Sequence, residues 1–263
     1  MKDVQGQTDN RGIDIHNVGV KDFHLPLLIR TREGGFQPVM ANVSLSVSLP
    51  MHFKGTHMSR FVEALLPWSS KPISNTELKS LLIDTCERLE ADSAEVTMAF
   101  KYFIEKTAPV SLKASFMDYD CIFKARREKE RHSFILGVEV PVTSCCPCSK
   151  EISDYGAHNQ RTLIKVKVRF HGGFLWIEDL VDRIEKQGSC QLYPLLKRED
   201  EKFVTERAYE NPKFVEDILR DTVIALRKEP LISWFDIECE SIESIHNHSA
   251  FARHTETKEQ MTY

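Results

Sequence analysis

Apolar and polar residues alternate along several stretches of the first half of the chain. In the segment VSLSVSL, four apolar side chains would face one way and three serines the other, which is typical of a half-buried antiparallel strand. Strands are predicted on this basis at residues 23–31, 38–49, 94–105, 110–125 and 133–142, with the charged segment RREKERH as the hairpin tip before the last one. The first twenty residues lack such a period and are expected to form an N-terminal arm.

A helical spacing of apolar residues interrupts these strands after residue 49. Apolar side chains from Met58 to Leu66 recur on one face of a helix. A second helix is predicted to begin at Ser74, because Ser74 and Glu77 have the spacing of a capping box, and to end before Asp92.

The second half of the chain repeats this order of elements without repeating its residues. A strand is predicted at 162–170, helical segments at 174–187 and 199–226, with a restart near Pro212, and a closing strand at 231–243. The last fifteen residues are expected to form a loop and tail. The sequence therefore predicts an α+β protein with an arm at 1–20 and two similar units at 21–145 and 146–263.

Composition narrows the class of protein. The chain has 263 residues, enough for a substantial core, and its formal net charge of −4 gives no general attraction to nucleic acid or anionic lipid. It lacks a run of eighteen apolar residues and its start is polar, so neither a membrane span nor a secretory leader is expected. Seven cysteines, an odd number, suit a reducing compartment with metal or thiol chemistry, and a cytoplasmic protein is expected.

The candidate chemistry gathers in VPVTSCCPCSKEISDYGAHNQR, residues 140–161, between two predicted strands. Cys145, Cys146 and Cys148 lie around a proline, and His158 follows in a loop loosened by Gly156. A thiolate and an imidazole from this segment could bind one ion.

Three kinds of site are compatible with these residues. A redox dithiol at Cys145 and Cys148 would favour a helix N-terminus in a βαβ unit, which the antiparallel pattern lacks. A closed structural zinc site would need a second ligand pair, for which His246 and His248 are available. The mixed set of donors favours a catalytic site with three protein ligands and one open position.

Other charged residues can be interpreted either as solvated surface charges or as functional groups. Glu201 and Glu216 lie in charged helical stretches, where carboxylates are usually solvated. The sequence has no glycine-rich phosphate loop, so phosphates would have to be bound by scattered side chains that are individually more typical of surface charges. The candidates are His57, Arg60, Lys150 and Arg161.

Four segments resemble one enzyme family, GTP cyclohydrolase I of type IB. They are KGTHMSRFVE (54–63), the segment 140–161, LLKREDEKFVTERAYENPKFVED (195–217) and ESIHNHSAFA (243–252). The resemblance implies the tunnelling fold, in which antiparallel sheets backed by helix pairs assemble into an oligomeric barrel, here as a homotetramer with active sites between subunits. It also implies a hydrolase of the folate pathway that converts GTP and water to 7,8-dihydroneopterin triphosphate and formate.

The same resemblance implies roles for individual residues. Cys146, Glu201 and His246 would bind one divalent metal per site, by default zinc, with manganese or iron as alternatives. His158 would lie close to the metal and the reacting ring and relay a proton, and Glu216 would anchor guanine through N1–H and the exocyclic amine. Second-choice ligands are His248 and Cys148, and Cys145 departs from the family pattern.

Two alternatives to this function follow from the same residues. A related tunnelling-fold nitrile reductase would use a cysteine as a covalent nucleophile, with nicotinamide and no metal. A non-catalytic binding module stabilised by zinc would unfold in chelator and would not convert GTP.

Overall fold

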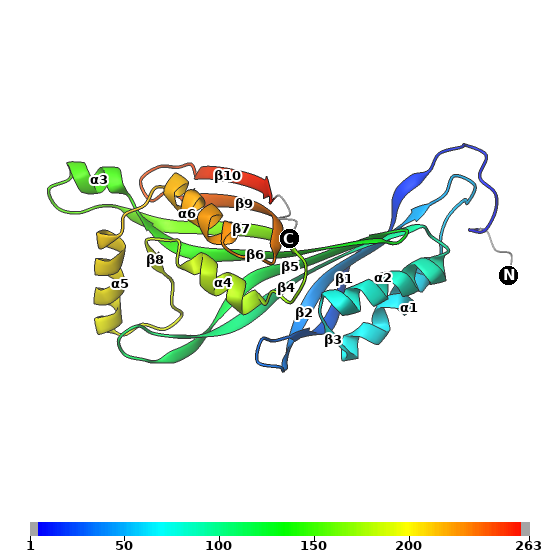
Figure 1. Cartoon of the computed structure of the whole chain (residues 1–263), viewed down its shortest axis with the longest axis horizontal. Helices are drawn as coiled ribbons and strands as arrows, with labels where there is room; N and C mark the ends of the chain where they lie inside the picture. The colour runs from blue at the N-terminus through cyan, green and yellow to red at the C-terminus, as the bar shows by residue number, and fades with distance from the viewer. Residues whose placement is uncertain (1–4, 259–263) are drawn as a thin grey trace. The chain divides into compact units, whose positions relative to one another are not determined.

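The structure, a computed structural model, describes residues 5–258, and its chain contacts divide into two compact units (Figure 1). The first unit comprises residues 1–101 and 122–136, and the second comprises 102–121 and 137–263. Three long strands contribute residues to both units: β4 (Ser93–Thr107), β5 (Ala114–Glu128) and β6 (Arg131–Cys145). No helix among the described residues is long and apolar enough to cross a membrane.

The first unit contains the strand pair and the helix pair that the pattern predicted. Its other elements are β1 (Ile15–Arg30), β2 (Phe36–Leu49), α1 (Met58–Leu65), the 3₁₀ helix η1 (Leu66–Ser70), β3 (Pro72–Ile73) and α2 (Asn75–Leu89). Helices α1 and α2 contact each other and bury Phe61 and Leu78 on their inner faces. The predicted capping box is confirmed, because the Ser74 backbone N–H donates to the Glu77 carboxylate at 2.9 Å.

The second unit contains the segments that carry the candidate chemistry. Its elements are α3 (Pro147–Ile152), β7 (Asn159–Phe170), α4 (Ile177–Glu185), β8 (Cys190–Gln191), α5 (Arg198–Glu210), α6 (Val215–Arg227), β9 (Ile232–Ile242) and β10 (Ala250–Thr257). Helix α6 packs against β9 and β10. The strand predicted at 162–170 is present within β7, with Val166 and Val168 buried and Lys167 exposed as expected. The expectation that Leu163 shares their face was wrong, because Ile164 is buried in its place and Leu163 is only half-buried.

The strands follow one order, β10-β9-β7-β6-β5-β4-β2-β1-β3, with β8 paired to β6. The described chain shows the same order of elements twice: two strands, two helices and two strands. This order occurs from β1 to β5 and again from β6 to β10, with α3, α5 and the short elements η1, β3 and β8 added. The α+β class is therefore confirmed. The prediction of two tandem units that meet between residues 145 and 146 is a statement about a duplicated architecture. Contacts within one chain do not test it, so it stays a prediction.

Two terminal expectations were wrong. Strand β1 begins at Ile15, inside the expected arm. Its first part was missed because two register shifts in its pairing with β2 interrupt the alternation of apolar and polar residues. Strand β10 occupies residues 250–257, where a loop and tail were expected. It ends the strand order, pairs only with β9 among the described strands, and is mostly polar, so it carries little apolar signal. Residues 259–263 of that expected tail lie outside the described residues.

One predicted strand begins too early. The expectation for 110–125 includes a turn, with Leu112 at a φ of 58°, before β5 starts at Ala114. The side chain of Asp200 accepts hydrogen bonds from the backbone N–H groups of Val110 and Ser111, at 2.8 and 2.9 Å. These N–H groups are therefore bound by a helix-borne carboxylate and not by a neighbouring strand.

Candidate functional site

Cys146 lies between the end of β6 and the first turn of α3. Its backbone N–H donates to the His158 carbonyl at 3.0 Å, and its Sγ accepts a weak hydrogen bond from the Ser149 N–H at 3.5 Å. The Ser149 hydroxyl in turn accepts from the His158 N–H at 3.2 Å. Pro147 at the first helical position requires no N–H partner there, which suits this abrupt strand-to-helix change. The loop thus closes on itself and holds the cysteine next to the histidine segment.

The three neighbouring cysteines have different surroundings. Cys145 is buried and packs with Cys190 and Ala208, and this burial raises the pKa of the Cys145 thiol. Cys146 is half-buried, whereas Cys148 is exposed. Cys145 is therefore a small core side chain, whereas Cys146 and Cys148 are the accessible thiols of this loop.

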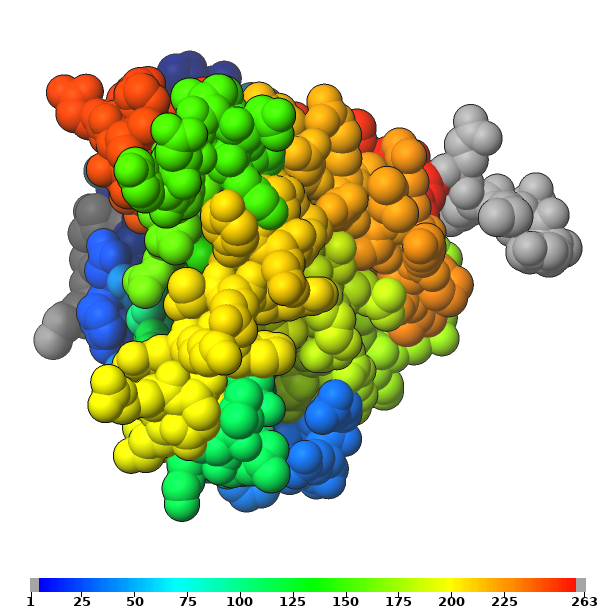
Figure 2. Space-filling model, turned by 90° about the vertical axis from the view of Figure 1, so that its left-hand side faces the viewer, coloured from blue at the N-terminus to red at the C-terminus, as the bar shows by residue number. Residues whose placement is uncertain are grey.

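The loop between β9 and β10 reaches the same place. Strand β7 pairs with β9 with Arg161 opposite Ile242, so the residues just before Arg161 face those just after Ile242. The Ser244 hydroxyl lies 3.4 Å from Nδ1 of His158. In Figure 2 the green segment that includes α3 lies beside the orange-red β9–β10 loop and the yellow α5. The loop that bears the predicted ligands His246 and His248 therefore begins beside His158.

The rings of His246 and His248 are exposed, and their centroids lie 5.1 Å apart. Two imidazoles that face solvent keep ring nitrogens available for a metal or a substrate. Both rings are exposed in the same loop, so the structure gives no preference between His246 and His248 as a ligand.

The end of α5 and the start of α6 also meet the cysteine loop. The Lys150 ammonium donates to the Tyr209 carbonyl at 2.6 Å and lies 4.3 Å from the centroid of the Tyr209 ring. The Lys213 backbone N–H donates to the Cys145 carbonyl at 2.9 Å. Glu216 follows in the first turn of α6, with its side chain exposed. The predicted guanine anchor therefore lies at the same end of the unit as Cys146.

Glu201 is not brought to this end. It lies in the first turn of α5, whereas Lys150 contacts Tyr209 in the last turn. Eight residues at 1.5 Å per residue separate these two positions by about 12 Å along the helix. Among residues 5–258 of a single chain, no three side chains of His, Cys, Asp or Glu gather in a way that could hold a metal.

The remaining predicted phosphate contacts are dispersed. His57 precedes α1 and Arg60 lies within it, both in the first compact unit. The Arg60 guanidinium donates to the Arg88 carbonyl at 3.1 Å, which ties α1 to the end of α2. Arg161 is exposed on β7 in the second unit. Of this set, Lys150 lies on α3 of the cysteine loop and Arg161 follows Gln160 on β7, whereas His57 and Arg60 belong to the other unit.

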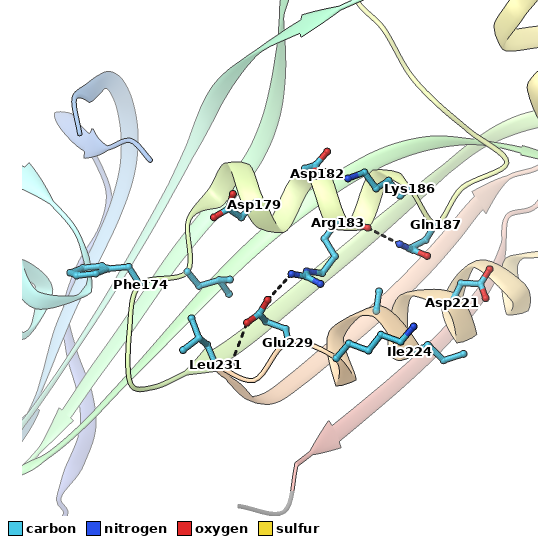
Figure 3. A pocket seen from close by; sticks show the side chains of 13 residues that line it. Phe174, Asp179, Asp182, Arg183, Lys186, Gln187, Asp221, Ile224, Glu229 and Leu231 are labelled. Carbon is cyan, nitrogen blue, oxygen red and sulfur yellow. Dashed lines mark hydrogen bonds and ion pairs between the residues drawn. The ribbon is translucent and has the colours of Figure 1, made fainter. Parts of the chain in front are cut away.

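A separate cavity of about 700 Å³ lies between α4 and α6, as Figure 3 shows. Many of its charged groups are already paired, with Arg183 donating to Glu229 at 2.6 Å and Lys186 to Asp182 at 2.6 Å. Its lining contains none of the predicted site residues. We therefore place the candidate site at the cysteine loop.

Sequence reasoning missed several residues that order the site. Ser149, Gln160, Glu243 and Ser244 lie inside the quoted segments, but no role was assigned to them. The bond between Gln160 and Glu243 joins residues 83 positions apart, and the contact between Ser244 and His158 joins residues 86 positions apart, so no local spacing could reveal these two. The bonds of Ser149 are local, to Cys146 and His158. Buried Asp200, next to Glu201, had a local signal, because its carboxylate accepts from the Lys197 N–H at 2.8 Å in the spacing of a helix cap.

Solved structures with the same arrangement of elements are uricases. The structure of a uricase from Arthrobacter globiformis matches with a TM-score of 0.57 and 8% identity, over 99% of this chain and 96% of that chain. The urate oxidase from Bacillus sp. TB-90 matches with a TM-score of 0.54 and 9% identity, over 93% of this chain and 100% of that chain. At such low identity these matches support the fold alone, which is the predicted tunnelling fold.

Comparison of the sequence with known proteins identifies the family as well as the fold. The family model of the type I GTP cyclohydrolase FolE2 matches residues 1–252. Among curated relatives, the GTP cyclohydrolase FolE2 of Geobacter sulfurreducens is 52% identical over 252 residues, covering 96% of each chain. The namesake from Magnetococcus marinus is 50% identical over 252 residues, covering 96% of this chain and 94% of that protein. With the tunnelling fold and the four motif segments, these matches establish that the chain belongs to the type I GTP cyclohydrolase FolE2 family.

Proposed function

We propose that this chain is a GTP cyclohydrolase of type IB, which converts GTP and water to 7,8-dihydroneopterin triphosphate and formate in folate biosynthesis. One observation carries the proposal: in a chain 52% identical to a named GTP cyclohydrolase over 252 residues, the cysteine loop, His158 and the loop with His246 are joined by hydrogen bonds. The thiol of Cys146, the imidazoles of the two loops and the exposed carboxylate of Glu216 are groups suitable for hydrolysis at a purine ring.

The donor set fits one divalent metal ion. We propose Cys146, Glu201 and His246 as its protein ligands, with His158 beside them and His248 and Cys148 as second choices. The half-buried thiol of Cys146 and the exposed ring of His246 are compatible with this role. When bound, zinc, manganese or iron would supply an activated water for attack on the purine at C8.

The surrounding side chains would bind and orient the substrate. Glu216, in the first turn of α6, can accept hydrogen bonds from N1–H and the exocyclic amine of guanine, a pair that adenine lacks. His158 can take up or return a proton at the opening ring. Lys150, Arg161, His57 and Arg60 are proposed to contact the triphosphate.

We further propose a homotetramer with active sites between subunits, assembled from tunnelling-fold units into a barrel. Support comes from Glu201, which lies about 12 Å from the Tyr209 contact along α5 and is exposed. If Glu201 is a ligand, it would therefore have to bind at the Cys146 site of a neighbouring copy and not at that of its own chain. A cytoplasmic location stays a prediction.

The decisive experiment combines metal analysis with a GTP assay. The purified protein is assayed for a fluorescent pterin after oxidation, then again after metal removal and after reconstitution. We expect pterin from the loaded protein, little after removal, and recovery on reconstitution. A loaded protein that forms no pterin would overturn the proposed function, and a metal-free protein that reduces a nitrile with nicotinamide would establish the alternative enzyme.

A further inference from the structure

Gln160 lies between His158 and Glu243, and its side-chain amide contacts both. Nδ1 of His158 is 2.8 Å from the Gln160 side-chain oxygen. The Gln160 side-chain nitrogen donates to the Glu243 carboxylate at 3.3 Å. The three side chains are partly buried, so these two hydrogen bonds form a relay that is partly shielded from water.

The direction of this relay follows from the acceptor at its end. A carboxylate accepts hydrogen bonds and has none to donate, so Glu243 requires the NH₂ group of Gln160. The amide oxygen of Gln160 then faces His158, and an amide oxygen can only accept. Nδ1 of His158 must therefore carry the proton, and the neutral ring has only one.

We infer that Gln160, oriented by Glu243, holds His158 in the Nδ1–H tautomer and leaves Nε2 as the acceptor that the ring offers to the site. The Ser244 hydroxyl, 3.4 Å from Nδ1, can accept a share of the same N–H. Both groups around Nδ1 are thus compatible with a protonated Nδ1.

The backbone beneath Gln160 is held in place as well. The Ser144 hydroxyl lies 3.4 Å from the Gln160 carbonyl oxygen and 2.8 Å from the Thr162 hydroxyl. Thr162 in turn lies 2.7 Å from the Ser241 hydroxyl. These buried hydroxyls connect β6, β7 and β9 under the relay and fix the backbone from which the Gln160 side chain projects.

The functional meaning of this tautomer rests on the proposed cyclohydrolase activity. A lone pair at Nε2 can bind a metal ion, or accept a hydrogen bond from the substrate or a water molecule. Neutral His158 would therefore enter the reaction as an acceptor, and it could donate from Nε2 only after taking up a proton there. Gln160 is a positioning residue, since it acts through His158.

The test is ¹⁵N NMR of the full-length protein labelled at its histidines, as isolated and without GTP. A His158→Asn spectrum identifies the His158 signals among the ten histidines. We expect the coupling pattern of an Nδ1–H ring in the native protein. Gln160→Glu keeps an acceptor beside Nδ1 and should keep this pattern, whereas Gln160→Leu should convert it to a mixture of both tautomers. Gln37→Leu, on β2, is the matched control and should change nothing.

An Nε2–H ring in the native protein would overturn the inference, and so would an unchanged pattern in a folded Gln160→Leu variant. Should that variant not fold, the native spectrum and Gln160→Glu still decide. The measurement needs no turnover, so a protein that forms no pterin would refute the proposed function and leave the tautomer assignment intact.

Discussion

Adjacent residues of one kind have different roles in this chain. Cys145 and Cys146 are neighbours, yet one packs in a buried cluster with Cys190 and the other is half-buried beside His158. Successive side chains at the end of a strand point to opposite faces, which explains the difference. Burial therefore removes Cys145 from the site, and Cys146 remains the proposed ligand, with Cys148 as the second choice.

A pair of cysteine substitutions tests this distinction. Cys146→Ala should lose the bound metal and at least about a hundredfold of the activity, because it removes a proposed ligand. Cys145→Ala should keep both, apart from a small loss of stability from the lost packing. Metal content and pterin formation are measured on both variants, and a Cys146→Ala protein with full metal and full turnover would refute the ligand assignment.

Substrate selection is tested at Glu216. Glu216→Ala should weaken GTP binding by about 1.5–3 kcal/mol, roughly 13- to 160-fold, because a hydrogen-bonded carboxylate is lost. Discrimination against ATP should fall in parallel. Glu206→Ala, an exposed glutamate on α5, is the control. If both variants bind GTP as tightly as the native protein, Glu216 is not the anchor.

At the scale of elements, helix starts are the features that local sequence specified best. The capping box at Ser74 and Glu77 was predicted and is present, because it depends on residues three positions apart. Strand β1 was shortened in the prediction because its bulges depend on β2. Strand β10 was missed because it is an edge strand with few apolar residues, and its formation depends on pairing with β9.

The contribution of this cap to stability is measurable. Ser74→Ala should lower the free energy of unfolding by about 1 kcal/mol, since an N-cap acceptor for the first turn of α2 is lost. Ser80→Ala, exposed on the same helix, should change it by less than about 0.5 kcal/mol. Urea unfolding followed by circular dichroism compares the two, and equal effects would show that the cap contributes nothing.

The start of α5 depends on a buried carboxylate. Burial by itself would raise the pKa of Asp200, but hydrogen bonds from Ser111, Lys197 and Val110 outweigh it and hold the pKa well below its ordinary value. Because the folded pKa lies below that of the unfolded chain, the stabilisation is complete above the ordinary Asp pKa of about 4 and is lost as pH falls toward the folded value.

Asp200→Asn should therefore destabilise the protein at neutral pH, and its deficit should shrink as the pH falls below about 4. Urea unfolding of native protein and variant across this range gives the difference directly. Asp154→Asn, at an exposed loop position, should show no such trend. A deficit that grows toward low pH would contradict the direction of the pKa shift.

At the scale of the whole molecule, stability and metal binding are separable. The described core is built from apolar residues of the strands and helices, such as Val43, Leu82 and Ile237. Chelation should therefore abolish pterin formation while shifting the melting temperature by only a few degrees, as for an open catalytic site. Complete unfolding in chelator would instead favour the zinc-stabilised binding module.

The sequence by itself determined most elements, the residue types of the site and the family. These depend on local period, on caps and on segments that the chain carries in order. Tertiary structure alone decided which cysteine is buried, that His158 lies beside the loop with His246, and that the cysteine loop meets α5 at Tyr209 and not at Glu201. The physical reason is pairing at long range: the β7–β9 register, with Arg161 opposite Ile242, brings together groups that no local pattern relates.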